Sequence, residues 1–332
     1  MTMDRTYNWA VLGCGRIAAK FSADLRLLPN ARLYAAASRS IDAARSFAAG
    51  QGYQKAYGSY EEMAADPEVD VVYVATPHAM HRDHAMLCLR NRKAVLCEKA
   101  FAINSREVSD MIQAARDNDA FLMEAFWTRF QPSFMKALDF IRSGELGALR
   151  MVRSDFAFNA GYDPDRRLHN VALGGGSLLD IGIYPVFVAL MALGKPPEIQ
   201  AMASFSPTGA EESIMVSFRY PGGRMASLAS SLAAYSPTEA EFWFEDGYMR
   251  LDRRFNAPTT VSMARGKEPE RTLAFAPGAG TGYELEAAHV MDCLDAGKKE
   301  SGLMPLSLSA DLMETLDRIR REAGIVFPGH DA

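Results

Sequence analysis

The chain has 332 residues, 48% of them hydrophobic, and a formal net charge of −5 at pH 7. This length exceeds the usual size of one hydrophobic core, so we expect two domains. The acidic balance argues against a nucleic-acid-binding protein, which would carry a basic surface. Because Met1–Asn8 is polar and we find no apolar run of the roughly 18 residues that a membrane helix needs, we expect a cytoplasmic protein that contacts no membrane.

Residues 1–124 alternate short apolar runs with helical patterns, which indicates βαβ units on a parallel sheet. We predict an α/β domain of the doubly wound Rossmann type. Its strands are expected at Trp9–Leu12, Arg32–Ala37, Lys55–Tyr57, Val69–Ala75, Ala94–Cys97 and Phe121–Met123. Its helices are expected at Arg16–Leu27, Ile41–Ala49, His81–Arg90 and Ser105–Asn118.

The pattern changes in residues 125–332, where strand-like runs are bounded by turn signals. We predict an α+β domain with a mostly antiparallel, open sheet. Its strands are expected at Met151–Phe158, Ile199–Ser204, Ser213–Tyr220, Met225–Ser231, Phe242–Phe244 and Tyr248–Asp252. Two helices, Tyr283–Ala296 and Ser307–Arg321, are expected to follow.

A further helix, Ser177–Leu193, is predicted after a run of three glycines, residues 174–176. Three glycines let the backbone pass close to another body, and Ser177 is a suitable N-cap. Pro185 inside the helix removes one backbone hydrogen bond and should kink it. A proline that interrupts the hydrogen bonding of a helix in this way is expected near a functional site.

The four cysteines show neither a C-x-x-C pair nor the spacing of a zinc site. We expect reduced, structural thiols at Cys14, Cys88, Cys97 and Cys293.

A G-x-G-x-x-A pattern lies where the first strand ends and the first helix begins, which is the setting of a dinucleotide site. Glycines let backbone amides approach a pyrophosphate, and the helix N-terminus adds a partial positive charge. The alternative is a tight turn that binds no ligand. The expected cofactor contacts come from Gly13, Cys14, Gly15, Arg16 and Ile17.

An NAD site would carry an acidic residue after the second strand, about twenty residues beyond the glycines. Ser38, Arg39 and Ser40 occupy that place here. A guanidinium can make a paired contact to a 2′-phosphate, and the serines can donate to it. The pattern favours NADP over NAD as the cofactor, and the alternative is that Arg39 is an exposed surface charge.

Thr76-Pro77-His78 follows the fourth core strand at the carboxyl edge of the sheet, where ligands of such folds bind. We expect this turn and His81 to line the cofactor. His78, His81 and His84 also resemble a metal cluster, but their spacing rotates around a helix and no acidic or thiolate partner is evident. No metal is predicted.

Lys99 follows the strand Ala94–Cys97 at the same edge, and Asp180 and Tyr184 lie four residues apart on one helix face. An ammonium close to a phenol lowers the phenol pKa from about 10, which suits a proton shuttle. Asp180 would orient substrate hydroxyls or the lysine and tyrosine. The alternatives are a solvated ion pair of Lys99 with Glu98, a helix-end charge and a core tyrosine.

The loop from Asn159 to His169 is rich in charge and either binds a polyol or is a solvated connection. Its candidate pocket residues are Asp163, Asp165, Arg166, Arg167 and His169.

With these residues placed, the chain resembles the Gfo/Idh/MocA family of oxidoreductases, which includes glucose-fructose oxidoreductase and inositol dehydrogenase. The likeness spans essentially the whole chain and is strongest over Trp9–Ala18, Ala75–Ala100 and Glu124–Leu193. The segments at residues 124–130 and 174–184 are similar to those of the dimeric trans-dihydrodiol dehydrogenases and the NADP-dependent D-xylose dehydrogenases.

The resemblance implies roles for particular residues. The lysine of a Glu-Lys-Pro motif and a later tyrosine or histidine are the catalytic groups of the family, which implies these roles for Lys99 and Tyr184. Inositol dehydrogenases carry histidine at the latter position, so the tyrosine favours the sugar and dihydrodiol branch. The implied cofactor contacts are Glu98, Lys99, Trp127 and Arg129, and the implied substrate contacts are Lys99, Phe158, Arg167, Asp180 and Tyr184. Relatives dimerise through the open sheet, so a homodimer is implied.

The chain departs from the family at Ala100, where proline is usual. Proline there can follow a cis bond, whereas a cis bond before alanine costs about 3–4 kcal/mol. We therefore expect Lys99 to be presented differently from its counterpart in the family.

The sequence thus predicts an NADP-dependent oxidoreductase that acts on a cyclic polyol, either an aldose such as D-xylose or a trans-dihydrodiol. One alternative is a sensor that binds nucleotide and sugar without chemistry, as the fungal galactose-pathway co-repressor of the family does. Another is an oxidoreductase that retains its cofactor, like glucose-fructose oxidoreductase itself. The secretion signal and N-terminal arm typical of that type are not expected here.

Overall fold

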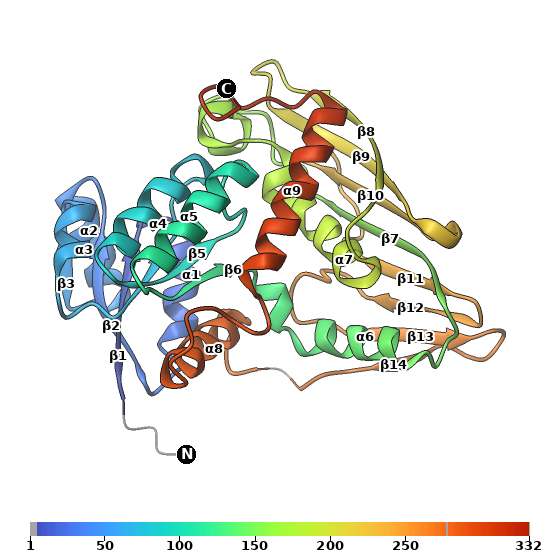
Figure 1. The fold of residues 1–332 in the computed structure, drawn as a ribbon, viewed down its shortest axis with the longest axis horizontal. Helices are drawn as coiled ribbons and strands as arrows, with labels where there is room; N and C mark the ends of the chain where they lie inside the picture. Colours follow the sequence, from blue (N-terminus) through green and yellow to red (C-terminus); the bar gives the residue numbers. More distant parts are fainter. Residues whose placement is uncertain (1–4, 277, 332) are drawn as a thin grey trace. The chain divides into compact units, whose positions relative to one another are not determined.

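The computed structural model describes residues 5–276 and 278–331 (Figure 1). The described residues divide into two compact units. The first comprises the chain up to residue 127 together with residues 278–310, and the second comprises residues 128–276 and 311–331.

The division differs from the predicted domains 1–124 and 125–332, because residues 278–310 return to the first unit. Helix α8 (Tyr283–Asp295) packs against α1 (Arg16–Leu25). At its start, the backbone N–H groups of Thr281 and Tyr283 donate to Asp24 Oδ2 at 2.9 and 3.0 Å. These polar contacts join residues more than 250 positions apart, which sequence periodicity does not reveal.

The first unit is built on a parallel sheet, as predicted. Its six described strands are ordered β3-β2-β1-β4-β5-β6, and every neighbouring pair is parallel. The strands are β1 (Tyr7–Leu12), β2 (Ala31–Ala37), β3 (Lys55–Tyr57), β4 (Val71–Val74), β5 (Ala94–Glu98) and β6 (Leu122–Ala125). In the strands other than β3, nearly all apolar side chains are buried, which is why these strands are continuous hydrophobic runs in the sequence. Ala56 and Tyr57 of β3 are half-buried.

The helices of the first unit form two packed groups. Helix α1 contacts α2 and α8, whereas α4 contacts α3 and α5. Strand order runs outward from β1 in both directions, and right-handed crossovers then place the two groups on opposite faces. Besides α1 and α8, the helices are α2 (Ile41–Gln51), α3 (Tyr60–Ala65), α4 (His81–Arg90) and α5 (Ser105–Asp117), and only the short α3 was missed from the sequence.

The second unit contains the predicted open sheet, with eight described strands ordered β14-β13-β12-β11-β7-β10-β9-β8. Among the described strand pairs of this second sheet, only β7 and β10 are parallel. The strands are β7 (Leu149–Ala157), β8 (Glu198–Phe205), β9 (Glu211–Arg219), β10 (Met225–Ser231), β11 (Ala240–Phe244), β12 (Gly247–Leu251), β13 (Val261–Arg265) and β14 (Arg271–Leu273). The sequence did not predict β13, β14 or helix α6 (Pro132–Ser143), and it did predict α9 (Leu306–Ala323).

The predicted helix Ser177–Leu193 is not continuous. Residues Leu178–Gly182 form one π-helical turn, η5, and the α-helix α7 begins only at Ile183 and runs to Leu193. Pro185 therefore lies in the first turn of α7, where its missing N–H costs little, and the irregularity comes from the π turn before it. Single π turns inside helices occur frequently at functional sites.

The stretch Val171–Leu193 also meets the length and composition criteria of a membrane span, with a hydropathy of 1.8, although the sequence analysis identified no such stretch. Within the second unit, 83% of its most apolar window is buried, and a core helix passes the same criteria. The finding is therefore weak evidence for a membrane span.

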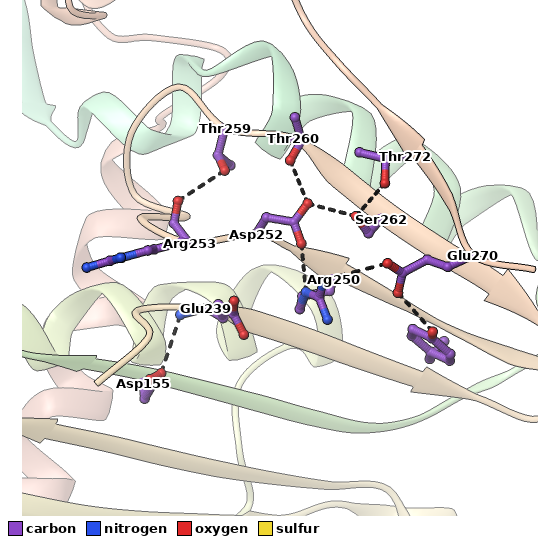
Figure 2. A network of polar contacts seen from close by, with 11 residues as sticks. Asp155, Glu239, Arg250, Asp252, Arg253, Thr259, Thr260, Ser262, Glu270 and Thr272 are labelled. Atoms are coloured by element: carbon purple, nitrogen blue, oxygen red, sulfur yellow. Dashed lines mark hydrogen bonds and ion pairs between the residues drawn. The ribbon is translucent and has the colours of Figure 1, made fainter. Parts of the chain in front are cut away.

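Strands β12, β13 and β14 are tied together by a polar network centred on Asp252 (Figure 2). Thr260 and Ser262 donate hydroxyl hydrogen bonds to Asp252 Oδ2, the latter at 2.8 Å, and Arg250 Nε donates to Oδ1 at 2.6 Å. Burial alone would raise the pKa of Asp252, but these hydrogen bonds and the guanidinium charge lower it below its ordinary value of 3.8. The network therefore stabilises the ionised carboxylate.

We expect Asp252→Asn to reduce the free energy of unfolding by about 2 kcal/mol at pH 7, since hydrogen bonds to a charged group contribute about 1.5–3 kcal/mol. Because the folded-state pKa is lowered, this stabilisation is present above pH 3.8 and is lost as the pH falls through the folded value. Urea denaturation at pH 7 and below pH 3.8 measures both effects. Glu198→Gln removes an exposed ion pair with Arg219 and serves as the control, with an expected loss under about 1 kcal/mol. Equal losses in the two variants would contradict the assignment.

Candidate active site

The glycine turn of the first unit leaves a helix N-terminus open to an anion. Gly13 has a φ of +100°, and a Cβ there would lie 2.9 Å from Thr76 Cγ2 and 3.0 Å from Ala75 O, so only glycine fits. A Cβ on Gly15 would meet nothing within 4 Å. Gly15 is also the N-cap of α1, which has no side-chain cap and no acidic residue in its first turn. Uncapped N–H groups beside an open space fit a pyrophosphate.

The segment Ser38-Arg39-Ser40 lies directly after β2, as predicted, and Arg39 is exposed. Ser40 caps α2 by accepting from the N–H of Ala43 at 3.4 Å. Burial raises the pKa of Tyr60, and the positive charge of Arg39 opposes that rise. The segment thus presents a cation and hydroxyls, with no acidic side chain among its three residues.

Three loops begin at the same edge of the parallel sheet. Leu12, Val74 and Cys97 are register partners in β1, β4 and β5. Gly13, Ala75 and Glu98 follow them, so the glycine turn, the Thr76-Pro77-His78 turn and the Lys99 loop leave the same edge. This arrangement confirms the predicted edge and puts the expected cofactor and catalytic residues of the first unit on neighbouring strands.

The backbone around Lys99 is held by buried acidic side chains. The N–H of Lys99 donates to Glu98 Oε2 at 3.2 Å, and the N–H of Phe101 donates to Glu124 Oε1 at 3.1 Å. The hydroxyl of Tyr73 donates to the other oxygen of Glu98. Burial raises the pKa of Glu124 to about 7. The peptide bond between Lys99 and Ala100 is cis, although alanine favours trans.

In the second unit, Asp180 on the π turn pairs with Arg167 from the charged loop, with Nη2 and Oδ1 2.8 Å apart. Tyr184, one turn further, is 6% exposed, and its ring centroid lies 5.6 Å from that of Phe156. The structure therefore joins Arg167 to Asp180, which the sequence paired with Tyr184, and it adds Phe156 beside Tyr184. Side chains alternate between the two faces of β7, so Val152, Ser154 and Phe156 share one face. Because Val152 and Ser154 are buried, this alternation indicates that Phe156 also points inward.

A buried carboxylate anchors the π turn. The Oε2 atom of Glu211 accepts from the N–H of Leu178 at 2.8 Å, and its Oε1 accepts from the Ser177 hydroxyl. Ser177 does lie at the N-cap position, as predicted, but its hydroxyl contacts Glu211 and Ser230 and makes no capping hydrogen bond. Burial raises the pKa of Glu211 to about 7. The sequence did not reveal Glu211, because it comes from β9.

Two glycines allow the close contacts around this turn. A Cβ on Gly175 would lie 2.5 Å from the carbonyl oxygen of Arg167, and one on Gly182 would lie 2.5 Å from Ser230 Oγ. The prediction that the glycine run permits a close backbone approach is therefore confirmed, and the loop that approaches is the one carrying Arg167.

The remaining predicted contacts occupy different settings. Trp127 stacks on Tyr283, with ring centroids 4.5 Å apart, and Arg129 is largely buried, with a pKa lowered by burial. Phe158 follows β7 and donates its N–H to Ser231 O at 3.1 Å. Arg166 pairs with Asp163 at 3.0 Å, so that part of the charged loop is an ordinary local ion pair.

All four cysteines are free thiols. Burial raises the pKa of each thiol, to about 11 for Cys14 and about 12 for Cys88, which keeps them protonated at neutral pH. No group of three or more metal-ligating side chains occurs among the residues that the structure describes.

Comparison with known proteins agrees with this arrangement. Residues 7–126 match the oxidoreductase family with an NAD-binding Rossmann fold, and residues 134–250 match the GFO/IDH/MocA C-terminal domain. A trans-1,2-dihydrobenzene-1,2-diol dehydrogenase from Bos taurus is 37% identical over 97% of this chain and 98% of its own length. The enzyme of that name from Homo sapiens is 38% identical over the same shares of the two chains.

Solved structures show the same fold. An aldose-aldose oxidoreductase from Caulobacter crescentus, complexed with glycerol, superposes with a TM-score of 0.87 at 25% identity, over 96% of this chain and 98% of that one. A 3-ketoreductase from Actinomadura kijaniata, in complex with NADP, superposes with a TM-score of 0.87 at 24% identity over the same shares. Both domains of this chain therefore match domains of one family, and the chain belongs to the Gfo/Idh/MocA family of oxidoreductases.

Proposed function

We propose that this oxidoreductase uses NADP to oxidise a CH–OH group of a cyclic polyol, with a trans-dihydrodiol as the first substrate class and an aldose such as D-xylose as the second. The observation that carries the proposal is the common sheet edge of the glycine turn and the Lys99 loop. Arg39 and its flanking serines support NADP over NAD. The names of the relatives at 37–38% identity support the dihydrodiol class.

The bound nicotinamide would supply the hydride acceptor. Gly13, Gly15 and the first turn of α1 would hold its pyrophosphate, and Thr76 and His78 would line it. Tyr184 would accept the substrate hydroxyl proton, and Lys99 would favour the phenolate by its positive charge.

Asp180 and Arg167 would orient the remaining hydroxyl groups of the substrate. Their ion pair presents an acceptor and a donor together, which is the pattern needed to bind vicinal hydroxyls. The side chains are 14% and 39% exposed, so both remain accessible to a ligand. Phe158 would add an apolar contact to the substrate ring.

The first experiment is to incubate the purified protein with NADP⁺ or NAD⁺ and a panel of D-xylose, D-glucose, anhydrosugars and a trans-dihydrodiol, and to follow the absorbance of the reduced nicotinamide. We expect reduction of NADP⁺ with the dihydrodiol first. Tight NADPH binding without turnover in either direction would instead support the non-catalytic sensor.

We also propose that the protein is a cytoplasmic homodimer joined through the open face of the second sheet. Met202 in β8 and Met215 in β9 are register partners and are 74% and 62% exposed, and Trp243 in β11 is 39% exposed. The alternate residues Ile214 and Val216 are buried, so the methionines lie on the outer face. An exposed apolar sheet face of this kind suits a self-complementary contact.

We expect Met215→Asp to weaken dimerisation by at least about 100-fold, because an unpaired carboxylate buried in an apolar contact costs several kcal/mol. Sedimentation velocity over a range of protein concentrations measures the change. Leu27→Asp, at a position 46% exposed in the first unit, should leave the sedimentation unchanged. A monomeric wild-type protein, or a dimeric Met215→Asp variant, would refute this interface.

A further inference from the structure

His81 is fully buried at the start of α4 and contacts two backbone carbonyl groups. Its Nε2 atom lies 2.7 Å from the oxygen of Thr76, and its Nδ1 atom lies 2.8 Å from the oxygen of Ala100. A carbonyl oxygen only accepts hydrogen bonds, so each ring nitrogen must donate. A neutral imidazole has a single N–H, so one ring nitrogen would then place a lone pair against a carbonyl lone pair. A ring that carries both protons would satisfy both contacts.

The two carbonyl groups belong to neighbouring loops at the edge of the sheet. Thr76 follows β4 in the turn expected to line the cofactor, and Ala100 follows Lys99. His81 thus links these loops through one rigid ring, which limits how far either loop can move relative to the other. The sequence predicted that His81 lines the cofactor, and in the structure both of its ring nitrogens contact backbone carbonyl groups.

The Lys99 loop is held on both sides of the histidine contact. Lys99 and Phe101 donate their N–H groups to Glu98 and Glu124, and Ala100 between them accepts from His81. The backbone of three consecutive residues is therefore bound by three ionisable side chains, each less than 7% exposed. Such a set restricts the loop more strongly than neutral hydrogen bonds would, because charged partners form stronger bonds.

Acidic side chains lie in the same cluster as His81. A buried imidazolium is costly unless negative groups lie near it. Glu98 and Glu124 each bind a peptide group adjacent to Ala100, so two carboxyl groups are available to compensate the ring. Other ionisable groups of this cluster are the Lys99 ammonium, the hydroxyl of Tyr73 on Glu98, and His78, whose ring centroid lies 5.6 Å from that of His81. Glu286 interacts with Glu98, the Cys97 thiol interacts with Glu98 and Glu124, and Glu107 accepts from the N–H of Ile103 in the same loop.

We infer that His81 is a positioning residue: held as an imidazolium, it locks the Lys99 loop to the Thr76 turn and so sets the position of Lys99. The protonation state is inferred from the two carbonyl contacts, whereas the kinetic consequence rests on the proposed function. Two separate measurements distinguish these parts.

The first measurement is NMR of the protein labelled with ¹⁵N histidine, at pH 7. The chain has six histidines, and the signals of His81 are those missing from the His81→Gln variant. If that variant does not fold, variants of the other five histidines identify the signals of His81 by elimination. We expect both ring nitrogens of His81 to be protonated. A ring with one protonated nitrogen would overturn the inference, whether or not the protein has enzyme activity.

The second measurement is a double-mutant cycle on the active substrate. We expect His81→Gln to lower kcat by 10-fold or more while the Kd for NADPH changes less than threefold. In a Lys99→Ala background the same substitution should change the remaining kcat less than twofold, because its effect passes through the lysine. A merely structural role would lower kcat by the same factor in both backgrounds, or would weaken NADPH binding, and would overturn the positioning role. Absence of wild-type activity on every substrate would count against the proposed function, and the protonation measurement would still decide the state of His81.

Discussion

Replacing Lys99 by alanine is expected to lower kcat by about 10²–10⁴-fold, and Tyr184→Phe is expected to do the same, since a positioned proton-transfer group contributes an effect of this size. In the proposed mechanism, alanine removes the ammonium that would favour the phenolate, and phenylalanine removes the hydroxyl that would exchange the proton. The glycine turn and the Arg39 segment are unchanged in both variants. The Kd for NADPH, measured by its fluorescence, should therefore stay within about twofold of wild type.

Matched controls come from residues of the same kind outside the site. Lys20 is exposed on α1, and Tyr235 is 80% exposed in the second unit. Lys20→Ala and Tyr235→Phe should keep full turnover. Loss of NADPH binding in Lys99→Ala or Tyr184→Phe would refute the proposed division between chemistry and cofactor binding, and retained turnover in either variant would remove that residue from the mechanism.

Arg39→Ala is expected to weaken NADP binding by about 10- to 100-fold and to leave NAD binding nearly unchanged. A hydrogen bond to a charged group contributes about 1.5–3 kcal/mol, and each 1.36 kcal/mol corresponds to a factor of ten. The 2′-phosphate is the only group by which NADP differs from NAD, so the loss should be confined to NADP. Titration of both reduced cofactors by fluorescence gives the two dissociation constants.

Arg45→Ala is the control for this experiment. Arg45 lies on α2 and is exposed, with a long ion pair of 3.9 Å to Asp42. Its removal takes away the same charge a short distance from Arg39, so it reports any general electrostatic effect. An equal loss of NADP affinity in both variants, or no loss in Arg39→Ala, would support the alternative that Arg39 is an ordinary surface charge.

The fold was largely predictable because its signals are local. Buried parallel strands are apolar along their whole length, and four helices of the first unit showed clear periodicity. Strand β14 was not predicted because it has only three residues. Strand β13 was not predicted because it is nearly all buried and shows no alternation of apolar and polar residues. The return of residues 278–310 to the first unit depends on contacts with Asp24, which are distant in sequence.

The candidate site was predictable to a lesser degree. The glycine turn, the Arg39 segment and Lys99 stand at strand ends, where the chemistry of a parallel sheet is expected. The roles of Glu124 and Glu211 were not predicted, because a glutamate in a strand is normally expected at the surface. Only the structure shows that these two are buried and which backbone groups they bind. The contacts of His81 with two carbonyl groups could not be predicted either, since those groups belong to two different loops.

The sequence by itself determined the family and the fold class of both domains, because these depend on residue type and spacing along the chain. The chemistry assigned to Lys99 and Tyr184 stays a prediction. Only the tertiary structure decided that Asp180 pairs with Arg167, that Glu211 anchors a π turn, and that His81 contacts two carbonyl groups. Those features depend on distances between segments that are far apart in the chain. Such distances are set by the packing of strands and helices, and packing is a property of the whole fold.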